Sequence, residues 1–103
     1  MASYHNISGE STQQLLAAGS NVSVTSISLT NVHADTSCTV DLYIEKTNVG
    51  NFHVIKNTIL PIGATLVLEG NDIKFSNKTN QFSLYIKLTK SASETPTVDV
   101  IIN

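Results

Sequence analysis

Residues 81–89 (QFSLYIKLT) alternate between polar and apolar side chains without a break. The apolar positions are Phe82, Leu84, Ile86 and Leu88. Because successive side chains of an extended chain point to opposite faces, a strand here has one apolar face and one polar face. A single strand cannot bury such a face by itself, so the rest of the chain must supply a second layer that covers it.

Residues 39–46 (TVDLYIEK) repeat this pattern. Val40, Leu42 and Ile44 lie in one phase, and the residues between them lie in the other. Both stretches contain the tripeptide Leu-Tyr-Ile. We interpret them as two central strands of a β-sandwich.

Shorter alternating segments supply the remaining strands, which we place at residues 11–18, 21–31, 52–58, 65–69, 73–75 and 97–102. A phase switch near residues 25–26 predicts a β-bulge or a strand that bridges both sheets. About eight short strands at a spacing of roughly 8–12 residues predict an all-β fold, a single antiparallel β-sandwich of jelly-roll or immunoglobulin-like type. The side chains expected to face inward are Val40, Leu42, Ile44, Leu66, Leu68, Phe82, Leu84, Ile86, Leu88, Val98 and Val100.

The chain of 103 residues is long enough for one hydrophobic core. Residues 1–10 are mostly polar and contain the breaker Gly9, so we predict an N-terminal arm that becomes ordered on a partner. Residues 11–103 are predicted to form the β-sandwich domain.

Charge excludes one class of function. Charged residues make up 14% of the chain, against about a quarter in an average soluble domain. The net charge is −2, and all 6 basic residues are lysines. Nucleic-acid binding favours a basic stripe that contains arginine, so we expect no nucleic-acid partner. We also see no signal peptide and no apolar run of membrane-spanning length, and we expect no membrane partner.

No group of residues has the spacing of a metal site. The three histidines, His5, His33 and His53, are far apart and show none of the close-spaced pairs that zinc sites use. Oxygen ligands are present in one turn at Glu69, Asn71 and Asp72, but without the spacing of a calcium loop. That turn is explained by side chains that bond their own backbone. We therefore predict no metal and no cofactor.

Cys38 is the one cysteine of the chain, and His33 and Asp35 lie close to it in sequence. A nucleophile and its base are normally assembled from separate elements around a pocket, whereas these three residues belong to one predicted loop. A small buried thiol at the start of a strand is the better interpretation. We predict no catalytic residue and no enzymatic activity.

Five residues are candidates for partner contacts. Tyr43 and Tyr85 lie on the polar faces of their strands, where they could hold a sugar ring or a protein partner, although tyrosine also simply suits strands. Tyr4 and Ile7 could attach the N-terminal arm to a neighbour. Ile101 points outward from the last strand and is either a contact or an ordinary exposed residue.

Several phrases resemble small virion proteins of tailed bacteriophages, most closely those of contractile-tailed phages of marine bacteria. The phrases are SVTSISLTNVHA (23–34), VDLYIEK (40–46), FHVIKNTILPIGATLVLEG (52–70), DIKF (72–75), FSLYIKL (82–88) and VDVIIN (98–103). The resemblance implies a structural β-sandwich without catalytic residues, used as a capsid decoration protein or in the neck, tail or fibre.

A virion protein of this kind would be made in the host cytoplasm and act in the virion by protein–protein contact. We expect its partners to be other virion proteins and copies of itself, with a trimer as the first guess. The alternative is a β-sandwich module that binds carbohydrate, such as a host glycan, or the host surface.

Overall fold

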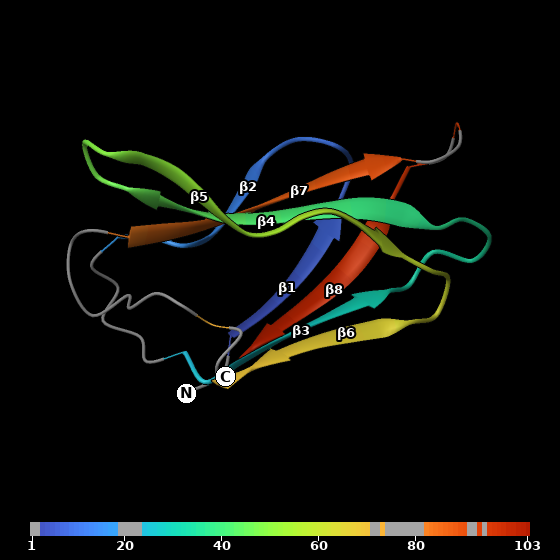
Figure 1. The fold of residues 1–103 in the computed structure, drawn as a ribbon. Helices are drawn as coiled ribbons and strands as arrows, with labels where there is room; N and C mark the ends of the chain where they lie inside the picture. Colours follow the sequence, from blue (N-terminus) through green and yellow to red (C-terminus); the bar gives the residue numbers. More distant parts are fainter. Residues whose placement is uncertain (1–2, 19–23, 71–72, 74–81, 91–92, 94) are drawn as a thin grey trace.

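The structure, a computed structural model, describes residues 3–18, 24–70, 73, 82–90, 93 and 95–103. These residues form eight strands and no α-helix (Figure 1). The strands are β1 (Ser3–Ser8), β2 (Gln13–Leu16), β3 (Ser26–Asn31), β4 (Cys38–Lys46), β5 (Gly50–Leu60), β6 (Thr65–Glu69), β7 (Phe82–Lys90) and β8 (Thr97–Ile102). A helix long and apolar enough to cross a membrane does not occur in this part of the chain.

The strands form two four-stranded antiparallel sheets, which lie face to face in Figure 1. Sheet A has the order β1-β8-β3-β6, and sheet B has the order β2-β7-β4-β5. The connectivity is that of one long hairpin whose tip is the β4–β5 turn. Along this hairpin the strands pair as β1–β8, β2–β7, β3–β6 and β4–β5. Rolling this hairpin up places β8 beside β3 and β7 beside β4. The predicted antiparallel sandwich is confirmed, and this strand order is that of a jelly roll rather than an immunoglobulin domain.

The core lies between the two sheets, and it is formed by the inward side chains of the alternating strands, as the sequence pattern predicts. Most of the predicted inward residues are at most 7% exposed, and Leu66 and Phe82 pack half-buried against them. The core also contains several residues that the sequence analysis did not assign to it: Leu15, Leu16, Ile27, Leu29 and Leu60. Ile101, between two buried residues of β8, points outward as predicted.

Within the arm predicted for residues 1–10, residues 3–8 are instead a strand of the sandwich. Ser3–Ser8 form β1, which pairs with β8 along its whole length. The pattern was hidden because the inward positions are Ser3, His5 and Ile7, of which just one is aliphatic. The predicted strand at 73–75 lies outside the described residues except for Ile73, which packs against the core.

Sheet B is irregular at both edges, whereas the ladders of sheet A have unbroken register. The β4–β5 ladder shifts register twice, on either side of Leu42. At one shift Asn57 has a positive φ of 49° and donates its backbone N–H to Asp41 Oδ1 at 2.6 Å. β2 shifts once against β7. The bulge expected near residues 25–26 is not part of β3, whose two ladders are regular.

One fully buried polar side chain joins the loops at one end of the sandwich. Asn31 is 1% exposed, and its Nδ2 donates to the carbonyl oxygens of Thr36 at 3.0 Å and Leu60 at 2.9 Å. Its Oδ1 accepts the backbone N–H of His33 at 2.9 Å. The amide therefore ties the β3–β4 loop to the end of β5.

Candidate functional site

The outer face of sheet B carries a row of side chains that crosses all four strands. Cross-strand pairing aligns Gln14 with Tyr85, Tyr85 with Tyr43, and Tyr43 with His53. The two tyrosine rings stack with centroids 5.5 Å apart and an interplanar angle of 21°. The Tyr43 and His53 rings are 5.2 Å apart, and Gln14 Nε2 donates to Tyr85 Oη at 3.2 Å. The structure thus brings the two predicted tyrosines together.

The stacking of this row limits what it can bind. Tyr43 has a ring neighbour on each side, Tyr85 and His53, so its two faces are already in contact. A sugar ring packs against a free aromatic face, and Tyr43 is flanked by a ring on each side. Tyr43 is therefore less suited to stack on a sugar than a tyrosine with a free face would be.

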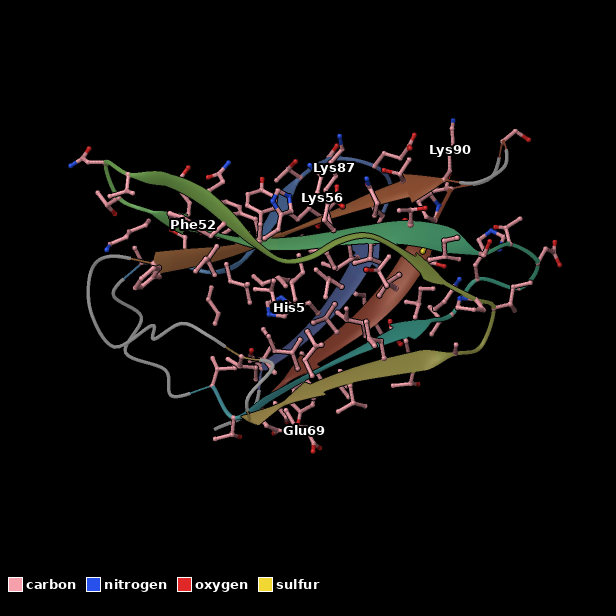
Figure 2. All side chains as sticks on the ribbon, in the orientation of Figure 1. His5, Phe52, Lys56, Glu69, Lys87 and Lys90 are labelled. Atoms are coloured by element: carbon pink, nitrogen blue, oxygen red, sulfur yellow. The ribbon has the colours of Figure 1, made fainter. Side chains whose placement is uncertain are left out.

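Charged side chains accompany this row. Lys87 pairs across the strands with Asp41, which also accepts the Asn57 N–H. Figure 2 shows Lys56 and Lys87 on the solvent side of sheet B. The outer face of sheet B therefore carries side chains of both signs of charge.

The outer face of sheet A carries a second row, of apolar character. Pairing aligns Tyr4 with Ile101, Ile101 with Ser28, and Ser28 with Val67. Tyr4 is 72% exposed, Val67 47% and Ile101 38%. Tyr4 and Ile101, both predicted as contacts, are thus direct neighbours, and Val67 extends their row to the far edge of the sheet. We call these four residues the apolar row.

Polar side chains beside the apolar row bond one another. Asn6 Nδ2 donates to Asp99 Oδ1 at 2.8 Å, and the hydroxyl groups of Thr30 and Thr65 are 2.8 Å apart. The polar groups beside the apolar row are therefore paired with each other.

Ile7, the fifth predicted contact, does not lie on either face. It is 4% exposed and belongs to the core. Because it is three positions from Tyr4 along a strand, it points to the opposite side of the sheet. Its prediction as a partner contact is therefore corrected.

No group of side chains in the described part of the chain could hold a metal ion. The three histidines lie apart: His5 is between the sheets (Figure 2), whereas His33 is in the β3–β4 loop and His53 is in the row on sheet B. His33 Nδ1 accepts the backbone N–H groups of Asp35 at 3.0 Å and Thr36 at 3.2 Å. Of the turn considered for calcium, Asn71 and Asp72 lie outside the described residues.

Cys38 lies at the start of β4 and is 1% exposed. Burial raises the pKa of its thiol above the ordinary value. A protonated thiol without solvent access is a poor nucleophile, which fits the buried packing residue expected from the sequence.

Cys38 should therefore resist a thiol reagent in the native protein near neutral pH and react once the protein unfolds. Since its pKa is higher in the folded state, the unfolded thiol loses its proton first as the pH rises above about 9. The free energy of unfolding should fall over that range by more in the wild type than in Cys38→Ala. Fast labelling of a protein whose circular dichroism remains native would contradict the buried placement.

Comparison with known proteins gives little further information. No protein-family model matches the chain, and no curated protein matches it either. One similar solved structure is that of the infectious bursal disease virus Gx strain, with a TM-score of 0.45 and 13% sequence identity. The alignment covers 99% of this chain and 33% of that chain, so this chain spans about a third of its length. A likeness of this degree does not indicate what the present protein does.

Proposed function

We propose that this protein is a virion structural component that acts by protein–protein contact, as a capsid decoration protein or as part of the neck, tail or fibre. The observation that carries the proposal is the apolar row on sheet A. Single exposed apolar residues are common, but Tyr4, Ile101 and Val67 lie on one line across the four strands of sheet A. Ser28 lies between Ile101 and Val67, and exposed apolar side chains gathered on one face in this way favour a site of protein contact.

Two further observations support a place in a virion. The jelly-roll order occurs in viral capsid domains and in lectins, an analogy of fold that leaves function open between these two classes. The resemblance of the sequence phrases to virion proteins of tailed phages favours the first class. We propose other virion proteins and copies of the chain itself as partners, with a trimer as the first expectation.

The carbohydrate-binding alternative ranks second. It would depend on Tyr43 and Tyr85, and the stacking of their rings leaves no free face on Tyr43 for a sugar. We also propose that the protein has no enzymatic activity, since its cysteine is buried and its three histidines lie on separate elements.

The test is to locate the protein in purified particles and to measure its mass in solution. We expect it in the particles and expect an oligomer in solution. Ile101→Thr should weaken association about tenfold, because the loss of apolar burial worth about 1.4 kcal/mol changes an equilibrium by a factor of ten. The matched control is Ile59→Thr, which alters a residue that is 68% exposed on β5 of the other sheet.

A strictly monomeric protein that is absent from particles would contradict the proposal and leave the carbohydrate-binding module as the better alternative. Equal weakening by Ile101→Thr and Ile59→Thr would show that the apolar row is not the contact surface.

A further inference from the structure

Strand β1 is held on one side only. Within the part of the chain that the structure describes, it forms an edge of sheet A and pairs with β8 alone. The six residue pairs run without a shift from Ser3 opposite Ile102 to Ser8 opposite Thr97. Any copy of the same segment could therefore occupy this place in the same register.

The inward face of β1 fits the core poorly. Ser3 Oγ and His5 Nε2 are buried without a hydrogen-bond partner, and they are the two such side-chain atoms among the described residues. Figure 2 shows His5 between the two sheets. Ile7 alone adds a buried aliphatic side chain. Because unpartnered buried polar atoms have lost their bonds to water, detachment of β1 would restore hydration to both groups. This lowers the free energy needed to open the strand.

A hinge follows β1 directly. Gly9 has a positive φ of 91°, a conformation that glycine adopts readily. The next residue is anchored, because Glu10 Oε2 accepts the backbone N–H of Lys90 at 3.0 Å and its Oε1 lies 3.8 Å from Lys90 Nζ. The backbone N–H of Gly9 donates to Pro96 O at 3.1 Å. Strand β1, whose inward side chains fit the core poorly, is thus joined through Gly9 to Glu10, which is bound to Lys90 of β7.

We propose that β1 exchanges between copies of this protein, so that β1 of one copy lies beside β8 of another. After exchange, β1 forms the same ladder with β8 and Ile7 makes the same core contact, so the main conformational change is at Gly9. Because exchange joins separate molecules, a high protein concentration favours it. A reciprocal exchange joins two copies, and a cyclic exchange joins three. The inference specifies how copies associate and does not require that the protein belong to a virion.

A disulfide between β1 and β8 shows which chain supplies the strand. Asn6 and Asp99 are cross-strand partners whose side chains are 2.8 Å apart, so Asn6→Cys with Asp99→Cys places two thiols opposite each other. Cys38→Ala is included to remove the native thiol. After oxidation of concentrated protein, non-reducing electrophoresis should show covalently linked chains. Covalent dimers on the gel indicate reciprocal exchange, and covalent trimers indicate cyclic exchange.

The matched control is Thr30→Cys with Thr65→Cys, in the same Cys38→Ala background. These residues join β3 and β6 of the same sheet, and their hydroxyl groups are also 2.8 Å apart. The control should give single chains with an internal disulfide. Tyr4→Cys with Ile101→Cys tests the same strand at a neighbouring pair, should the first pair disturb folding.

Complete disulfide formation within single chains at both β1–β8 pairs, in concentrated protein, would overturn the proposal. Linked chains in the control to the same extent would overturn it as well, since the linkage would then not report β1. Ser3→Val with His5→Leu should slow the appearance of linked chains several-fold, because β1 then fits the core better. This readout is independent of the particle experiment, so either proposal can fail alone.

Discussion

Leu84→Ala should lower the free energy of unfolding by about 2–5 kcal/mol, the range for a buried leucine that leaves a cavity. Leu84 is 0% exposed and lies in β7, which pairs with both β2 and β4 in sheet B. Ile86, also 0% exposed on the same strand, should behave similarly when changed to alanine. Denaturant titration followed by circular dichroism gives the measurement.

Lys87→Ala provides the control on the same strand. Lys87 is exposed on the outer face, and its replacement should change the free energy of unfolding by no more than about 0.5 kcal/mol. Wild-type melting of both Leu84→Ala and Ile86→Ala would contradict the placement of β7 in the core. A far-ultraviolet spectrum dominated by helix would contradict the fold itself.

Asn31→Ala should destabilise the protein by about 3 kcal/mol, although it deletes no hydrophobic contact. The substitution removes the donors for the carbonyl oxygens of Thr36 and Leu60 and the acceptor for the His33 N–H. Because Asn31 is 1% exposed and its bond to Leu60 O is buried, water does not replace that bond without opening the structure. Denaturant titration measures the loss.

Two further variants make this test specific. Asn31→Asp keeps an acceptor for His33 but lacks the N–H donors, so it should also be destabilised. Asn51→Ala, at an exposed position of β5, should be nearly neutral. If Asn31→Ala were as stable as Asn51→Ala, the buried amide would not join the loops as described.

The sequence predicted the strands that have regular alternation of large side chains. β4 and β7 are the clearest cases, because each places three or more aliphatic residues in one phase. β1 was missed because Ser3 and His5 occupy inward positions, so no apolar period marks the strand. The order of strands was also left open between two architectures. It depends on pairing between distant segments, such as β1 with β8, and local patterns carry no information about such pairing.

The sequence predicted only part of the candidate surfaces, because a local pattern gives the direction of a side chain but not its neighbours on other strands. The outward direction of Tyr43 and Tyr85 follows from period two, and their contact follows from pairing of β4 with β7. The addition of His53 depends on a register shift in β5, for which the sequence gives no clear signal. Val67 joins Ile101 only through β3, which lies between β6 and β8.

The irregular edges of sheet B also bear on how the protein avoids fibrous aggregation. An added strand needs an even series of backbone N–H and C=O groups, and edge strands that offer such a series can template continuous growth. β5 interrupts the series at two register shifts, and β2 is four residues long with a shift of its own. Stacking of strands from molecule to molecule is therefore blocked at both edges of this sheet. At high protein concentration, the edges of sheet B are therefore poor templates for the addition of strands from other copies.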